Sequence, residues 1–232
     1  MKIVCIADTH AKTLPDSMLP DGDVLVHAGD VTNNGKRLQM ESMSQWFTHL
    51  ADTKYEHIVF VAGNHDFMLD AFRTEGHEYA VNGRLFPHPR VHYLRDERLW
   101  LNFMDGKAGR TLKFWGTPWT ISGNWAFSEM DRSKRREIFA KIPLDTNVLI
   151  SHGPPYSILD RTQNGEHFMS VGDLELLGAT ERVRPQLHVF GHIHDGYGVA
   201  TPGLDTTFVN AASTQIVGGK YELGNPPIVI DI

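Results

Sequence analysis

Five short apolar runs in this 232-residue sequence end in residues that can bind a metal ion, and no other feature constrains the fold as strongly. Each run is short, apolar and β-branched, as the buried strands of an α/β sheet are. The runs are KIVCIA (2–7), DVLVHAG (23–29), HIVFVAG (57–63), NVLISHG (147–153) and QLHVFGH (186–192). The residues that end them are Asp8-Thr9-His10, Gly29-Asp30, Gly63-Asn64-His65-Asp66, His152-Gly153 and Gly191-His192-Ile193-His194. Because sites in α/β sheets gather where strand carboxyl ends meet loops, we expect these side chains to lie close together.

Taken one at a time, these strand ends have simple structural explanations. A Gly-Asp pair is typical of a turn, Gly-Asn-His-Asp suits an Asx turn that caps a helix, and a single histidine is more often hydrogen-bonded than a ligand. Taken together, the simple explanations require five strands to acquire metal-competent residues by coincidence. Carboxylates, imidazoles and an amide oxygen without a thiolate are typical ligands of Mn, Fe, Zn or Ni. We therefore interpret the joint pattern as a metal site, in which the preceding glycines allow tight turns.

The rest of the sequence predicts an α/β fold with a mixed sheet. Helical spacing of apolar residues predicts an amphipathic helix over 36–52, residues 131–142 predict a charged helix, and a shorter helix is expected after Asp66. Residues 98–104 and 111–116 flank DGKAG, which indicates a hairpin, and residues 206–212 and 227–231 are further strand candidates. Residues 76–95, rich in Gly, Pro and His, are expected to be irregular. With 41% hydrophobic residues and no repeat or linker, residues 1–232 are expected to form one domain.

Charge and cysteine content argue against several classes of protein. The formal net charge of −6 argues against a general binder of nucleic acid or anionic membranes, although a small basic cleft stays compatible with it. The single cysteine, Cys5, cannot form an intrachain disulfide, which fits a cytoplasmic protein. The first apolar run stops at Asp8, unlike a signal peptide, and no stretch is long enough to cross a bilayer. Of the 13 histidines, those outside the strand-end motifs are expected to be structural or exposed.

The strand-end motifs resemble those of the calcineurin-like metallophosphoesterases. The family pattern is Asp-x-His, Gly-Asp, Gly-Asn-His-Asp/Glu, a strand-end His and Gly-His-x-His, and this sequence contains every element in that order. The segments SHGPPYSILD, GHIHDGYG and FWGTPWT resemble more specifically the MPPED-type branch, close to the class III cyclic nucleotide phosphodiesterases. The resemblance implies a four-layer αββα sandwich with two mixed β-sheets and a di-metal site at the carboxyl edge of the strands.

The resemblance also implies how the ligands are divided between two divalent or trivalent transition-metal ions (Mn, Fe, Zn or Ni). One ion would be held by Asp8, His10, Asp30 and His194, and the other by Asp30, Asn64, His152 and His192. Asp30 would bridge the ions, because two cations about 3.5–4 Å apart need an anionic ligand between them. His192 and His194 would project to the same side of an extended segment, roughly 6–7 Å apart, which suits ligands of neighbouring ions. A hydroxide between the ions would attack phosphorus in line, and the cations would neutralise the phosphoryl oxygens.

His65 resembles the family histidine near the leaving group, which implies a general acid or a donor to a phosphate oxygen. With Asp30 and Asn64 it completes the expected catalytic residues. In many members a carboxylate three residues after the bridging aspartate orients this histidine, whereas here Asn33 stands at that position. An amide can hydrogen-bond to the imidazole but cannot raise its pKa as a carboxylate would. Strong acid catalysis is therefore less expected, which matters least for substrates with good leaving groups.

The candidates for substrate contact include aromatic side chains between the third and fourth motifs. Trp119 and Trp125 are expected to stack a base or an aryl group, with core packing as the alternative, whereas Trp115 is assigned to the core. The full set of candidates is Asn33, His65, Trp119, Trp125, Tyr156 and Arg161. Arg161 would serve equally in a surface ion pair, and Asn33 in a turn. RSKRR (132–136) is expected to be a solvated helix face rather than a nucleic-acid patch.

The resemblance implies an enzyme that hydrolyses small phosphodiesters, with cyclic nucleotides among the candidates and phosphomonoesters as further substrates. One alternative is a metal-dependent nuclease of the Mre11-like type, against which the short and acidic chain counts. Another is a non-catalytic scaffold with the same fold, against which the complete ligand set counts. The expected partner is a small phosphoester, with nucleic acid disfavoured, no membrane association, and a homodimer left open.

Overall fold

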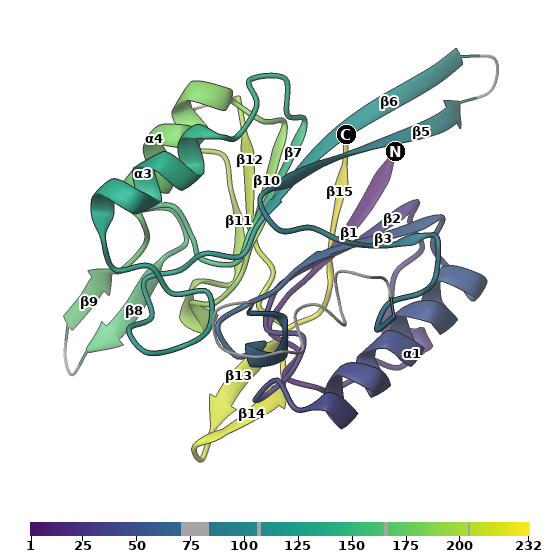
Figure 1. Cartoon of the computed structure of the whole chain (residues 1–232), viewed down its shortest axis with the longest axis horizontal. Coiled ribbons are helices and arrows are strands. Elements are labelled where there is room, and N and C mark those ends of the chain that lie inside the picture. The colour runs from purple at the N-terminus through teal and green to yellow at the C-terminus, as the bar shows by residue number, and fades with distance from the viewer. Residues whose placement is uncertain (71–83, 106–107, 165–166, 204) are drawn as a thin grey trace.

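Two β-sheets pack face to face at the centre of the protein, and helices cover their outer faces (Figure 1). The structure is a computed structural model that describes residues 1–70, 84–105, 108–164, 167–203 and 205–232. No helix in these ranges combines the length and apolarity that crossing a bilayer requires. The carboxyl ends of the central strands of both sheets meet at one edge, and this edge carries the candidate site.

The first sheet has five strands in the order β15-β1-β2-β3-β4. Strands β1 to β4 run parallel to one another, while β15 pairs antiparallel with β1. The bounds are β1 (Lys2–Ile6), β2 (Val24–Ala28), β3 (His57–Val61), β4 (Val91–Tyr93) and β15 (Ile228–Asp231). The sheet is thus mixed, as predicted, with its antiparallel strand at the edge.

The second sheet has six strands in the order β11-β12-β10-β7-β6-β5. The four inner strands are parallel, and each outer strand pairs antiparallel with its neighbour. The bounds are β5 (Glu97–Asp105), β6 (Ala108–Thr117), β7 (Val148–Ser151), β10 (Leu187–Phe190), β11 (Gly198–Ala200) and β12 (Thr207–Asn210). Two small hairpins are formed by β8 (Arg161–Asn164) with β9 (His167–Ser170) and by β13 (Thr214–Val217) with β14 (Lys220–Leu223).

Alternation along the strands produces the layers. In β1, Ile3 and Cys5 face the core between the sheets, while Val4 and Ile6 face α1 (Arg37–Thr53). On the other side, α3 (Arg132–Ala140) and α4 (Leu174–Val183) pack against Leu149. Side chains that alternate along a strand point to opposite faces, so these fully apolar strands can be buried on both sides. The predicted four-layer α/β sandwich is confirmed.

Several elements differ from their prediction. After Asp66 the chain forms a short 3₁₀ turn, η2 (Phe67–Leu69), and residues 71–83 lie outside the described ranges. The segment expected to be irregular contains β4, and its first residues, 76–83, also lie outside the described ranges. Helix α4 and both small hairpins were not predicted, although Asp173 caps α4 and Gly218-Gly219 stands between β13 and β14, both recognisable signals. Two further 3₁₀ turns are η1 (Asp16–Met18) and η3 (His194–Gly196).

His188 is a structural histidine that should make stability depend on pH. It is fully buried on β10, and burial lowers its pKa to about 3. The unfolded chain takes up a proton at this side chain below pH about 6.5, whereas the folded protein does not. Stability is therefore lost as the pH falls through this range, by about 2 kcal/mol between pH 6.5 and pH 5 for one such group.

We expect His188→Gln, measured by urea unfolding in a chelating buffer, to lose less unfolding free energy between pH 7 and pH 5 than the wild type. The same change at His167, which is exposed on β9, serves as the control and should leave the pH dependence unaltered. Identical pH dependence in the wild type and His188→Gln would contradict the assignment.

Candidate metal centre

The candidate ligands lie at the strand ends where the two sheets meet. Asp8 follows β1, Asp30 follows β2, Asn64 follows β3, and His152 directly follows β7. These four side chains are at most 4% exposed, which places polar atoms where the sheet ends would otherwise be apolar. His192 and His194 follow β10 and are half-buried.

The backbone at several of these residues adopts an uncommon conformation. Asp8, His10, Asp30 and His192 have φ angles of 52°, 48°, 53° and 68°. Residues other than glycine seldom occupy this left-handed region, and doing so costs free energy that the surrounding structure must supply. The bends turn each side chain out of its strand direction and toward the others. Strain at four candidate ligands marks this edge as a functional site.

Two glycines are required here by close contact. A Cβ on Gly63 would lie 2.3 Å from the Asp30 Oδ1 atom, and a Cβ on Gly191 would lie 2.1 Å from the Asp8 Oδ2 atom. Both distances are far shorter than non-bonded contacts allow. The glycines before Asn64 and His192 therefore do more than permit a turn, because they leave room for the carboxylates of neighbouring strands.

The first group of candidate ligands surrounds Asp8. The His194 Nε2 atom lies 3.6 Å from the Asp8 Oδ1 atom and 3.5 Å from the His10 Nε2 atom. The His10 Nε2 atom is also 3.8 Å from the Asp30 Oδ2 atom. Asp8, His10 and His194 converge closely enough to hold one ion, with Asp30 beside them. This is the set that the resemblance to the family implies for the first metal.

The second group surrounds the other oxygen of Asp30. The His152 Nε2 atom lies 3.4 Å from the Asp30 Oδ1 atom and 2.9 Å from the Asn64 Oδ1 atom. On the opposite side of the ring, Nδ1 donates to the Ala28 carbonyl oxygen at 2.9 Å, which fixes the ring with Nε2 toward the site. The His192 ring is 5.0 Å from that of His152. Asp30 thus presents one oxygen to each group, as a bridging ligand would.

The charges of this cluster fit bound cations. Among the described residues, the basic side chains within 4 Å of the Asp8 and Asp30 carboxylates are all imidazoles. Burial opposes the protonation of His152, but the Asp30 carboxylate outweighs it and raises the pKa of that imidazole to about 9. Burial alone would raise the pKa of Asp30, yet His152 holds it far below the ordinary value. Metal ions could take over the neutralisation that a proton provides here.

His10 and His192 differ from His152 in their protonation. Burial lowers the pKa of each to about 4, so both imidazoles are neutral at pH 7 and keep a free lone pair. The donor set of carboxylates, imidazoles and one amide oxygen matches the preferences of Mn, Fe, Zn or Ni. The residues present therefore fit a two-metal centre.

His65 lies at the rim of the cluster and is held by main-chain groups. Its backbone N–H donates to the Asp30 Oδ1 atom at 2.8 Å, and its Nε2 atom is 3.9 Å from the Asp30 Oδ2 atom. The ring Nδ1 donates to the main-chain carbonyl oxygen of Asn33 at 2.7 Å. The Asn33 side chain is exposed, and its main-chain carbonyl rather than its amide group makes this contact with the ring.

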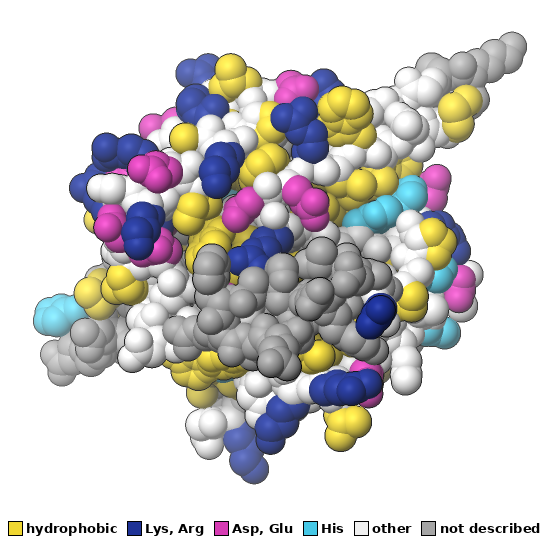
Figure 2. All heavy atoms as spheres, viewed as in Figure 1, with side chains coloured by type: hydrophobic (Ala, Val, Ile, Leu, Met, Phe, Trp, Pro, Cys, Tyr) yellow, Lys and Arg dark blue, Asp and Glu magenta, His cyan; other side chains and the backbone are white. Residues whose placement is uncertain are grey.

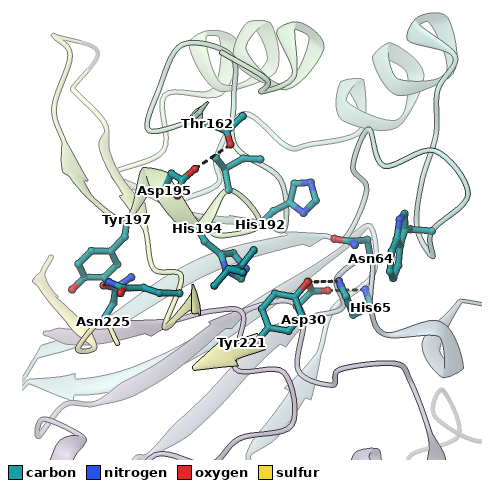
Figure 3. A pocket seen from close by; sticks show the side chains of 14 residues that line it. Asp30, Asn64, His65, Thr162, His192, His194, Asp195, Tyr197, Tyr221 and Asn225 are labelled. Carbon is teal, nitrogen blue, oxygen red and sulfur yellow. Dashed lines mark hydrogen bonds and ion pairs between the residues drawn. The ribbon is translucent and has the colours of Figure 1, made fainter. Parts of the chain in front are cut away.

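A cavity of about 680 Å³ opens over the candidate ligands (Figure 3). This volume is within the range of small-molecule sites. Its described lining consists of Asp30, Asn64, His65, Trp125, Thr162, His192, Ile193, His194, Asp195, Tyr197, Gln215, Ile216, Tyr221 and Asn225. Figure 3 shows the imidazoles and Asp30 gathered on one side, with Tyr197 and Asn225 farther along the cavity.

The structure brings only some of the expected substrate contacts to this cavity. Trp125 is 43% exposed and its ring lies 4.5 Å from that of His65. Trp119 instead packs between hydrophobic clusters and donates from Nε1 to the Asp96 Oδ2 atom at 2.6 Å. Tyr156 and Arg161 are exposed outside the described lining. Trp119 is thus a packing residue, the alternative already considered for it.

The sequence did not indicate the part of the cavity lining that the two small hairpins contribute. Tyr221 on β14 stacks on His10 with ring centroids 3.7 Å apart and an interplanar angle of 11°. Thr162 on β8 donates to the Asp195 Oδ2 atom at 3.0 Å. Both residues come from the two small hairpins that were not predicted. Only the β13–β14 hairpin has a clear signal in the sequence, which is the Gly-Gly turn before Tyr221.

The basic helix does not form a free cationic patch. Arg132 and Arg136 of α3 pair with Glu175 of α4, and Arg135 pairs with Asp173. Figure 2 shows Lys and Arg side chains interspersed with Asp and Glu over this part of the surface. The prediction of a solvated helix face agrees with the exposure of Arg132, Lys134 and Arg136, whereas Arg135 is buried.

Comparison with known proteins identifies the family. A model of the calcineurin-like phosphoesterases matches residues 1–196, so the chain belongs to that family. Human metallophosphoesterase domain-containing protein 1 is 36% identical over 241 residues, which cover 100% of this chain and 71% of the human protein. The UPF0046 protein K07C11.7 of Caenorhabditis elegans is 36% identical over 218 residues, covering 91% of this chain and 69% of the worm protein.

A solved structure shares the fold at low identity. GAP50, the anchor in the inner membrane complex of Plasmodium, superposes with a TM-score of 0.58 at 12% identity, covering 98% of this chain and 76% of GAP50. The MPPED-type resemblance seen in the motifs is confirmed by the human relative. Family membership supports metal-dependent hydrolysis of phosphoesters as the general chemistry.

The two ligand groups make different predictions for single substitutions. His194→Ala should lower the affinity for the ion beside Asp8 and His10 by at least about tenfold. Even the loss of a group that only orients a metal ligand costs that much affinity. His192→Ala should lower the affinity for the ion beside Asn64 and His152, and Asp30→Ala should lower the affinity for both ions. Metal content after dialysis and calorimetric titration measure these effects. If His192→Ala and His194→Ala empty the same site, the division is wrong.

Proposed function

We propose that this protein is a di-metal phosphodiesterase that acts on small phosphodiesters. The observation that carries the proposal is the convergence of two donor groups on the two oxygens of Asp30, beneath a cavity of about 680 Å³. Two bound metals would supply Lewis acidity and an activated water. Asp8, His10 and His194 would hold one ion, Asn64, His152 and His192 the other, with Asp30 shared between them.

His65 would act at the leaving group. Its Nε2 atom faces the cavity beside Asp30, while Nδ1–H is engaged with the Asn33 carbonyl oxygen. A neutral carbonyl oxygen is a weaker hydrogen-bond acceptor than a carboxylate, so it assists proton donation by His65 less than a carboxylate would. The proposed enzyme therefore suits substrates whose leaving groups need little protonation.

Preference for diesters over monoesters rests on the charge of the cavity. Its described lining contains no lysine or arginine, whereas Asp195 adds a carboxylate beyond the metal-binding edge. A phosphomonoester dianion has an additional charge that a basic side chain would have to neutralise. A diester carries one charge, and its second arm can extend along the cavity past Trp125 and Tyr197. Cyclic nucleotides are members of this class, and monoesters would be slower substrates.

Two alternatives make different predictions. A nuclease would need a basic surface beside the cavity to bind a nucleic-acid backbone, and the arginines of α3 are paired with acidic residues instead. A scaffold would keep the fold without turnover. The nearly complete burial of Asp8 and Asp30 among imidazoles favours a retained metal site over a relic.

The test is a panel of substrates offered to protein reconstituted separately with Mn²⁺, Fe²⁺, Zn²⁺ and Ni²⁺. We expect bis(4-nitrophenyl) phosphate to be hydrolysed at least about tenfold faster than 4-nitrophenyl phosphate in kcat/KM, because uncompensated charge opposes the monoester. The panel also contains 2′,3′- and 3′,5′-cyclic nucleotides and single-stranded DNA. Chelation should abolish turnover, and re-addition of metal should restore it.

Asp30→Asn keeps the size of the shared ligand but removes its charge, and should lower kcat/KM by more than about 100-fold. Lys113→Gln, on the exposed side of β6, is the matched control and should retain wild-type rates. Turnover of the monoester as fast as the diester would exclude the diester preference. Absence of metal-dependent turnover on every substrate would favour the scaffold.

A further inference from the structure

Tyr221 contacts the candidate metal centre from a hairpin that follows all of the candidate ligands in sequence. Its ring lies parallel to His10 at 3.7 Å and makes an edge contact with His65 at 5.6 Å. It also lines the cavity, where Figure 3 shows it beside Asp30. A half-buried tyrosine in this place can act on the site through its ring and through its hydroxyl.

The hydroxyl lies 3.4 Å from the Nε2 atom of His65. The other ring nitrogen, Nδ1, faces the Asn33 carbonyl oxygen at 2.7 Å, and a carbonyl can only accept. In neutral His65 the proton is therefore on Nδ1, which leaves a lone pair on Nε2. In this neutral form the Tyr221 O–H donates to Nε2 of His65, whereas in the doubly protonated ring, which has a proton to give to a leaving group, Nε2–H donates and the Tyr221 oxygen accepts.

The ring of His65 is thus restrained on several sides. The Asn33 carbonyl holds one nitrogen, the Tyr221 hydroxyl meets the other, and the Trp125 ring covers a face at 4.5 Å. A catalytic side chain is effective only when its rotamer is fixed within a narrow range. Without the hydroxyl, the ring could turn about its remaining hydrogen bond, and Nε2 would spend less time facing the cavity.

We propose that Tyr221 is the positioning residue for His65, through a hydrogen bond between its hydroxyl and Nε2. The inference rests on the proposed function, in which His65 assists the leaving group. It assigns the β13–β14 hairpin a part in the reaction in addition to its part in the cavity wall. The hydroxyl should then matter for leaving groups that need assistance and matter little for those that do not.

The first test compares two diesters that differ only in the leaving group, methyl 4-nitrophenyl phosphate and methyl phenyl phosphate. Tyr221→Phe keeps the ring on His10 and removes the hydroxyl. We expect its kcat on the phenyl ester to fall about tenfold and its kcat on the nitrophenyl ester to fall less than about threefold, with KM little changed. Equal losses on both esters, or no loss on either, would overturn the proposal.

Tyr197→Phe is the matched control. Tyr197 also lines the cavity, but its hydroxyl donates to the Pro226 carbonyl oxygen at 2.8 Å, away from His65. This variant should leave the ratio of the two rates as in the wild type. Tyr221→Ala removes the ring as well, so it should additionally weaken metal binding beside His10, which Tyr221→Phe should not.

The second test is independent of turnover. In metal-free protein with ¹⁵N-labelled histidine, long-range ¹H–¹⁵N spectra report the tautomer of each ring and the hydrogen bonding of each nitrogen. The His65 signals, assigned with His65→Gln, should show the Nδ1–H tautomer, and the Nε2 signal should shift in Tyr221→Phe but not in Tyr197→Phe. An unchanged Nε2 signal would overturn the inference. If the wild type turns over no ester, the proposed function fails, and the spectra alone decide whether Tyr221 positions His65.

Discussion

The burial of two carboxylates at the meeting point of the sheets is the constraint on which the rest of this structure depends. Asp8 and Asp30 are at most 2% exposed, and ionised groups are tolerated there only with charge neutralisation and hydrogen bonds. The backbone N–H of His192 donates to Asp8, and that of His65 donates to Asp30. The carboxylates therefore fasten the loops that carry the other candidate ligands, so that the fold and the metal site stabilise each other.

A third buried carboxylate, that of Asp66, supports these loops but is not a candidate metal ligand. Asp66 accepts hydrogen bonds from the backbone N–H groups of Gly63, Val31 and Thr32, and from the Thr32 hydroxyl. Burial and the neighbouring Asp30 raise the pKa of Asp66 to about 6 despite these donors. The contacts join the loops after β2 and β3 and offset part of the strain at Asp30. The last residue of the Gly-Asn-His-Asp motif is thus structural, while the residues before it face the site.

The sequence could predict the buried strands and the clustering of the residues that end them because both depend on local patterns, whereas the layering into two sheets followed only from the resemblance to the family. Buried strands are recognisable as apolar runs. The residues that follow parallel strands meet at one edge of the sheet because of the topology alone. The cavity wall could not be predicted in the same way. Trp119 and Trp125 stand in one Pro- and Gly-containing stretch, and their different roles follow from Asp96, which captures only the first indole. Tyr221 reaches His10 only through the docking of a hairpin more than 200 residues away along the chain.

The order of these parts along the chain places one side of the cavity after all of the candidate metal ligands. The family match ends at residue 196, shortly after the last candidate ligand, whereas Tyr197, Gln215, Tyr221 and Asn225 all come later and line the cavity. Residues 213–225 fold back over the metal-binding edge as a separate hairpin, which is joined to the loop after β1 by hydrogen bonds from Ser213 to Ala7 and from Thr214 to Asp8. Exchanges at Gln215 or Asn225, which line the cavity from this segment without contacting a candidate ligand ring, could therefore change the shape of the cavity while Thr214 and Tyr221 keep their contacts with Asp8 and His10. Substrate range among relatives would then diverge faster than metal chemistry.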